Sequence, residues 1–339
     1  MRFGSVAVES GVSRANGRAL RSRWEWSILI LPAAVFVLLM LSQLWITDGL
    51  AGAIAPAATG PAEVGEFARG FLQISALTLA YILICLAAIQ YFWREVRAAG
   101  ADLSAERRRA VGAACAAIGG FGAALAVVHT FFPSFFAVSR ITLEPTIGAY
   151  GATTDAIGIS RLHGQLLALA PNLAGVAAAV AGSLHAALVT RRAVAEAGPA
   201  PVENGATPDG VPPSLLNGMV VVSGVLVASV LLVSLHVHAH GPLYGAGAPA
   251  AHAEFANFVS VVWGIGLSLV VALIYVPHLV RLGYAGRSAL AGAAAADGAN
   301  GPRGAPLFQK VEMALAIFGP VIIAVLARSL DRLLKAWGG

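Results

Sequence analysis

The sequence predicts an all-α protein, a polytopic bundle of about seven transmembrane helices. Of its 339 residues, 58% are hydrophobic and only 12% are charged, a balance too apolar for a soluble domain. Seven stretches approach or exceed the roughly 20 apolar residues with which a helix crosses a bilayer. Arginines gather in every second connection between these stretches, which is typical of a multi-pass membrane protein. We therefore expect the bundle to be surrounded by lipid.

The apolar stretches define the expected helices in chain order. Residues 1–25 form a basic tail, and the apolar run after it is long for a signal peptide, so we expect it to remain as the first span. Backbone groups in lipid have no water partners, so each span is expected to be a helix. The predicted spans are 26–46, 70–93, 110–132, 159–189, 215–238, 255–278 and 311–327, which together form one bundle over residues 26–338.

Lysine and arginine set the predicted orientation of this bundle. The N-terminal tail and the connections after the second, fourth and sixth spans are rich in arginine, so they are predicted to be cytoplasmic. The alternate connections hold only Arg69, Arg140 and Arg161. This pattern predicts a multi-pass protein of a bacterial-type inner membrane with a cytoplasmic N-terminus. It also accounts for the net charge of +5 without a nucleic-acid partner.

Two features at the cytoplasmic side complete the predicted topology. The connections 194–213 and 284–306 are rich in Ala, Gly and Pro and are expected to be flexible linkers. The basic tail after residue 327 conflicts with the charge rule, since seven full crossings would leave it outside. Either the last helix crosses against the rule, or Gly319 and Pro320 kink it so that the tail lies along an interface.

The histidines are the best functional clue in the sequence. Six of the eight fall at the outer ends of the predicted helices, whereas His185 and His278 fall near the inner side. Imidazole binds zinc, copper and iron and serves as an axial ligand of haem. His236 and His240 are four residues apart and would share a helix face if the helix continues that far, whereas His238 would point elsewhere. If the helix ends before His240, at Gly241 and Pro242, the geometry is open. The outer histidines are His129, His163, His236, His238, His240 and His252.

Two of these histidine segments resemble a known family. The stretch RLHGQLLALAPNLAGVAAAVAG is similar to the haem-bearing helix of haem-copper oxidase and nitric-oxide-reductase core subunits, and the run HVHAH is similar to their H-x-H element. The resemblance implies that His163 is an axial ligand of a low-spin haem, with His236 or His238 opposite. The chain departs from the family in having fewer spans and no adjacent His-His pair for copper. The resemblance therefore does not imply oxygen reduction.

The leading functional hypothesis is an outer site that binds haem or a transition metal such as copper, for electron transfer or metal handling. His163, His236 and His238 are the candidate cofactor ligands, and His129, His240 and His252 are the further metal ligands. Such a protein would be a membrane oxidoreductase or an electron-transport protein.

Two alternatives remain open. The first is a transporter or channel for a small solute or ion, in which Gln165, Asn172 and the glycines 119, 120 and 122 line a path. The two amides are costly in lipid and are expected to face the bundle interior. The second alternative is a non-catalytic subunit or assembly factor that binds other membrane subunits through interfacial histidines.

Overall fold

The part of the chain described by the computed structural model is helical almost throughout and contains no strand. It comprises residues 61–100, 105–131, 161–196, 212–239, 241, 249–297, 311 and 313–326. The helices are α2 (Pro61–Gly100), α3 (Ala105–Phe131), α5 (Arg161–Glu196), α6 (Pro213–Ala239), α7 (Pro249–Asp297) and a short last helix (Met313–Leu326). The expectation of a helical bundle is confirmed for these residues, and the predicted first span, 26–46, lies outside them.

Four of the helices are long and apolar enough to cross a membrane. Their candidate spans are Leu72–Ala98, Leu169–Val194, Pro213–Ala239 and Glu254–Leu282, which overlap the predicted second, fourth, fifth and sixth spans. The apolar parts of α3 and of the last helix are shorter, Cys115–Val128 and Met313–Leu326. A multi-pass membrane bundle is thus supported, and the number of seven spans stays a prediction.

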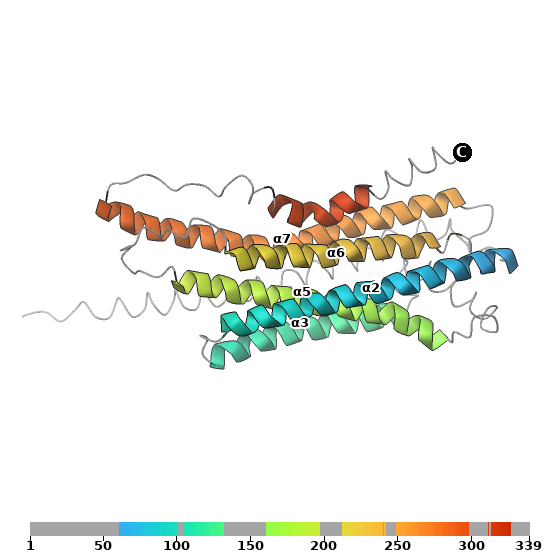
Figure 1. The fold of residues 1–339 in the computed structure, drawn as a ribbon, viewed down its shortest axis with the longest axis horizontal. Coiled ribbons are helices and arrows are strands. Elements are labelled where there is room, and N and C mark those ends of the chain that lie inside the picture. Colours follow the sequence, from blue (N-terminus) through green and yellow to red (C-terminus); the bar gives the residue numbers. More distant parts are fainter. Residues whose placement is uncertain are drawn as a thin grey trace, which may run out of the picture.

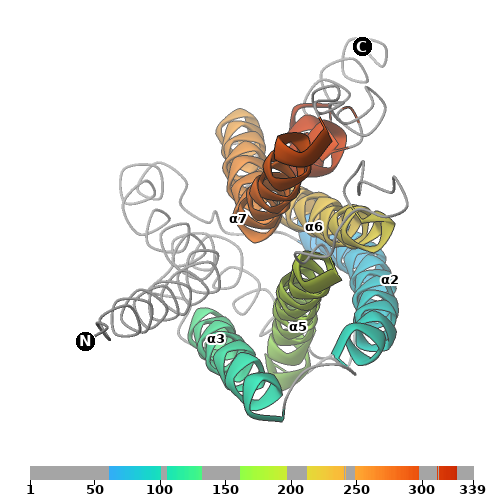
Figure 2. The ribbon, with the colours of Figure 1, turned by 90° about the vertical axis from the view of Figure 1, so that its left-hand side faces the viewer.

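Helix α5 occupies the centre of the bundle. It packs against α2, α3, α6 and α7, whereas the packing of α3 is almost entirely on α5. Figure 1 shows the helices running roughly alongside one another, and Figure 2 shows α5 between α2 and α3 with α6 and α7 on its other side. The last helix crosses α7 at Gly264, where the backbone atoms of Val321 come close.

Small residues allow the neighbours of α5 to approach closely. A Cβ on Gly175 would lie 2.6 Å from Tyr81 Oη of α2, and a Cβ on Gly182 would clash with Val222 of α6. On the other side, a Cβ on α3 Gly122 would lie 2.7 Å from Val176 Cγ1. Small residues at helix contacts are typical of membrane bundles, because close backbone approach increases van der Waals packing.

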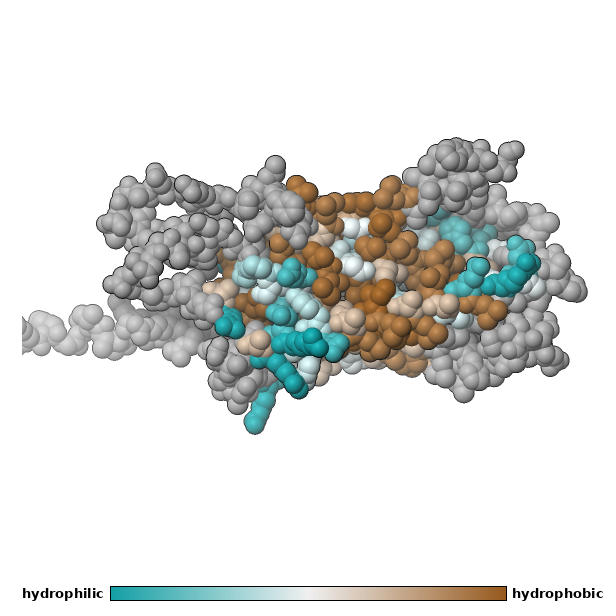
Figure 3. Space-filling model, viewed as in Figure 1, coloured by the Kyte–Doolittle hydropathy of each residue, from teal (hydrophilic) through white to brown (hydrophobic). Residues whose placement is uncertain are grey.

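The surface of the bundle matches a lipid environment. Figure 3 shows an apolar band around the middle, with hydrophilic residues toward both ends of the described part. Helix α2 contributes strongly to this band, because Leu72, Leu79 and Leu83 are each more than half exposed. In water such a row of exposed leucines would be unfavourable, whereas in lipid it has no cost.

The segment expected to be a flexible linker, 284–306, is helical over its first part. Helix α7 continues to Asp297 and so includes residues 284–297. This segment, YAGRSALAGAAAAD, is dominated by alanine, which has the highest helix propensity of all residues. The other expected linker, 194–213, is helical up to Glu196 and again from Pro213, and residues 197–211 lie outside the described ranges.

Candidate functional site

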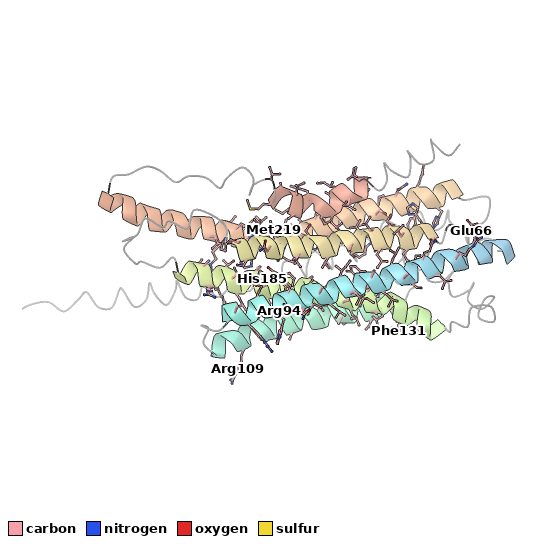
Figure 4. All side chains as sticks on the ribbon, in the orientation of Figure 1. Glu66, Arg94, Arg109, Phe131, His185 and Met219 are labelled. Atoms are coloured by element: carbon pink, nitrogen blue, oxygen red, sulfur yellow. The ribbon has the colours of Figure 1, made fainter. Side chains whose placement is uncertain are left out.

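The candidate site residues fall at two ends of the bundle. The arginine end is where α2 and α5 finish and α6 begins, and it carries Arg94, Arg97 and Arg109 among others. Figure 4 places His185 in the half next to Arg94 and Arg109, whereas Glu66 and Phe131 lie in the opposite half. That opposite half contains the end of α6 and the start of α7, and we call it the His238 end.

Two histidines of α6 and α7 lie in the same region of the His238 end. His238 Nδ1 lies 2.7 Å from the carbonyl oxygen of Ser234. A carbonyl only accepts hydrogen bonds, so Nδ1 carries a proton, and Nε2 is the nitrogen that could bind a metal. His252 is 2% exposed, and a Cβ on Gly241 would lie 3.6 Å from its Nδ1. The two imidazoles are close enough for the charge of one to act on the other.

The environment of His252 keeps this imidazole neutral. Burial, followed by the nearby positive charge of His238, lowers the pKa of His252 from 6.5 to about 4. Neutral imidazole is the form that binds metal ions and haem iron. His252 therefore has the protonation state that a ligand site requires.

The other predicted histidines are distributed around this pair. His236 is half-buried near the end of α6, His163 lies in the first turn of α5, and His129 lies near the end of α3. All three helix ends belong to the His238 end (Figure 1). Because α3 packs on α5, the backbone at His129 is on the side of α5 away from α7. His240 lies outside the described residues.

A compact metal centre is not present among the described side chains. No three His, Cys, Asp or Glu residues of this part of the chain lie together in a way that could hold a metal ion. The side chains at positions 129, 163 and 240 are outside this description. His238 and His252 could provide at most two ligands, the number that the axial positions of haem require, whereas copper or zinc would require further ligands.

A second polar cluster, which we call the inner cluster, lies near the arginine end and consists of His185, Tyr275 and His278. They are 0%, 0% and 4% exposed. Both ring nitrogens of His185, the hydroxyl of Tyr275 and Nδ1 of His278 have no hydrogen-bond partner among the described residues. A Cβ on Gly218 would lie 2.5 Å from His185 Nδ1 and 3.3 Å from Tyr275 Oη, so both atoms flank one point on α6.

Aromatic rings of α2 close this cluster. The ring centroids of Phe92 and Tyr91 lie 5.3 Å and 6.1 Å from that of His185. Tyr91 also lies near enough to Tyr275 to affect it electrostatically. In the same way, Arg191 and Arg281 lie near enough to affect His278. Sequence reasoning missed this cluster, because it set His185 and His278 aside as inner residues. The one signal in the sequence was the spacing of Tyr275 and His278, three residues apart around Pro277.

The residues expected to line a transport path are placed differently from the prediction. Asn172 is exposed on α5, so its expected place in the bundle interior is wrong. Gly122 packs closely on Val176, and a Cβ on Gly119 would lie 3.7 Å from Val180. These two glycines therefore serve helix packing between α3 and α5. The side chain of Gln165 is outside the description.

Comparisons of this chain with protein-family models, with curated proteins and with solved structures find no match.

Proposed function

We propose that this protein is a multi-pass membrane protein that binds haem or a transition metal at the His238 end and serves electron transfer or metal handling. The proposal rests on one observation, the electrostatic proximity of His238 on α6 to the buried His252 on α7. It extends to seven spans, a cytoplasmic N-terminus and a bacterial-type inner membrane, for which the support is the distribution of arginines along the sequence.

The orientation of His238 supports a ligand role. Histidines that bind metals commonly donate the hydrogen of the other ring nitrogen to a carbonyl or carboxylate, which holds the ring in place. The hydrogen bond from His238 Nδ1 to the Ser234 carbonyl is of this kind. A bound haem or copper ion would supply one-electron chemistry, while the chain would supply neutral imidazoles and an apolar surrounding.

Further ligands can come from the same end of the bundle. His236 and His240 lie on the segment that carries His238, and His163 begins the helix that packs on both α6 and α7. A bis-histidine haem requires only two of these residues, whereas copper or zinc requires three or four. The described pair therefore favours haem over an isolated metal ion.

Optical spectroscopy and metal analysis of the purified full-length chain test this proposal. We expect either a haem spectrum or about one metal ion per chain, retained during purification. His238→Ala and His252→Ala are each expected to lose most of the cofactor. Ser260→Ala is the matched control, because Ser260 is a buried α7 residue whose hydroxyl bonds only the helix carbonyl of Ala256, at 2.8 Å.

The outcomes separate this function from its competitors. A wild-type protein without haem and without stoichiometric copper, zinc or iron would rule the proposal out. Solute transport or a role as a non-catalytic subunit would then be the functions to test. If the cofactor is bound and is retained in both His238→Ala and His252→Ala, the ligands lie elsewhere and the assignment to this pair is wrong.

A further inference from the structure

The inner cluster has buried polar atoms that the chain itself does not satisfy. His185 and Tyr275 are completely buried, and neither His185 nitrogen nor Tyr275 Oη has a hydrogen-bond partner among the described residues. Leaving such a group unpaired is unfavourable, because it has lost its hydrogen bonds to water without gaining others. Several such groups beside one point on α6 would be a large cost for a bundle to carry. Buried water commonly removes this cost by bonding two to four polar atoms at once.

The backbone of α7 has a freed acceptor at the same level of the helix. Pro277 lies inside α7 and has no N–H, so the carbonyl of Leu273 lacks its usual helical partner. Leu273 and Pro277 are each two residues from Tyr275, and both are only partly buried, so this carbonyl lies on another face of α7. In membrane helices such freed carbonyls are often satisfied by ordered water. The inference of bound water therefore rests on the side-chain atoms of the inner cluster.

The cluster also extends toward one membrane face. His278 is four residues from the end of its candidate span at Leu282, about 6 Å along the helix. His185 is nine residues from the end of its span at Val194, about 14 Å. The groups around His278 are Arg191 and Arg281, which belong to the arginine end. The polar atoms therefore lead from this end into the bundle.

We propose that His185, Tyr275 and His278 bind water molecules and form a path by which protons from the arginine end reach the interior of the bundle. This inference does not depend on the metal or haem site, since it uses other residues in the other half of the molecule. Chains of histidine and other ionisable residues within membrane helices are the usual components of proton relays.

Each group on this path can pass a proton without a net change of charge. An imidazole accepts a proton on one ring nitrogen and releases a different proton from the other, which leaves the neutral ring in its second tautomer. A phenol hydroxyl accepts a proton on its oxygen while its own proton leaves. Before a second proton can follow in the same direction, the hydroxyl turns and the imidazole returns to its first tautomer by exchanging protons with bound water. The charged form of His185 is short-lived in this scheme, because a buried charge is costly.

Several groups surround His185. From α2, Tyr91 and Phe92 lie beside the ring, and from α7, the hydroxyl of Tyr275 flanks the same point at Gly218 as Nδ1 does. Helix α6 presents Gly218, whose missing side chain leaves room for the imidazole. Arg191 and Arg281 act electrostatically on His278 toward the arginine end.

Water-edited solid-state NMR of the full-length protein in lipid bilayers tests the path. With 15N-labelled histidine, magnetisation from water is expected to reach the His185 ring nitrogens as fast as those of His278. Tyr275→Phe and His278→Leu are each expected to slow the transfer of magnetisation to His185 by at least about tenfold. This factor is smaller than the factor by which a positioned proton-transfer group typically raises a reaction rate. Ser260→Ala removes a buried hydroxyl from the same helix outside the path and should leave the transfer unchanged.

Loss of a signal in His185→Gln assigns that signal to the His185 ring. If this variant does not fold, the signal can be assigned instead through its spatial proximity to the Phe92 ring. The proposal is overturned if His185 receives no more water magnetisation than the buried backbone amide of Val222. It is also overturned if both Tyr275→Phe and His278→Leu exchange at the wild-type rate. Because these readouts do not involve a cofactor, a failure here leaves the proposed metal or haem site untouched, and the reverse also holds.

Discussion

Each half of the bundle holds a buried histidine against a glycine, but the two contacts leave different amounts of space. At the arginine end, a Cβ on Gly218 would lie 2.5 Å from the ring of His185, closer than atoms can pack. At the His238 end, a Cβ on Gly241 would lie 3.6 Å from His252 Nδ1, an ordinary contact. The ring of His185 is thus packed tightly against the backbone of α6, whereas the space beside His252 Nδ1 could hold a methyl group.

The two sites also differ in how their polar atoms are satisfied. His238 donates from Nδ1 to the Ser234 carbonyl of its own helix, which holds the ring in one orientation. The inner cluster has hydrogen-bonding atoms that no described residue satisfies. An oriented imidazole suits a fixed ligand such as a metal centre, whereas several unsatisfied atoms in a tight space suit small exchangeable molecules. Burial alone therefore does not decide what a membrane histidine does.

The largest expected effect is the response of the His238 end to acid. The pKa of His252 is about 4 in the folded protein and 6.5 when it is exposed. Above pH 6.5 the ring is neutral in both states, and as the pH falls toward 4 only the unfolded state gains the proton. Folded metal-depleted protein should thus lose on the order of 3 kcal/mol between pH 7 and pH 4 through this residue.

Unfolding of wild type and His252→Gln by denaturing detergent at several pH values measures this loss. The stability of the wild type should fall more steeply than that of the variant between pH 6.5 and 4. If the stabilities of the two proteins fall in parallel as the pH is lowered, His252 is hydrated in the folded state. The difference in burial between the two histidine sites would then be smaller than in the structure.

The second prediction concerns the tight contact of the inner cluster. Gly218→Ala places a methyl group against His185, and overpacking of this kind costs about 1–3 kcal/mol. Gly224→Ala on the same helix is the matched control, because a Cβ there meets nothing within 4 Å. The midpoint of thermal unfolding in detergent should fall for Gly218→Ala only. Equal midpoints for the two variants would show that the imidazole can move away freely.

Hydropathy and charge were sufficient to predict the helices, because lipid burial depends on composition over about 20 residues. The proximity of His238 to His252 depends instead on the rotation and register of α6 against α7, which no pattern within either helix encodes. For this reason His236 and His240 were expected to share a site face while His238 pointed elsewhere, yet His238 is the residue coupled to His252. The inner cluster escaped prediction because Gly218 brings His185 and Tyr275 together from distant parts of the sequence.

The third prediction asks whether the inner cluster holds water. If the hydroxyl of Tyr275 bonds a water molecule, Tyr275→Phe removes that hydrogen bond and should lower the free energy of unfolding by about 1 kcal/mol. If the hydroxyl is truly unpaired, the same change removes a buried unsatisfied group and should raise stability instead. Detergent-induced unfolding at neutral pH distinguishes the two signs, and an increase in stability would contradict the proposed water path.

The smallest effect is expected at the glycine of the His238 end. Gly241→Ala adds a methyl group 3.6 Å from His252 Nδ1 and 3.8 Å from Cε1, so the free energy of unfolding should change by less than about 0.5 kcal/mol. The same methyl group narrows the space next to the histidine pair, so bound cofactor should decrease although the fold is intact. Metal or haem content and unfolding are therefore measured on the same preparation. A large loss of stability would place His252 in a contact as tight as that of His185, and the two ends would then be equivalent in packing.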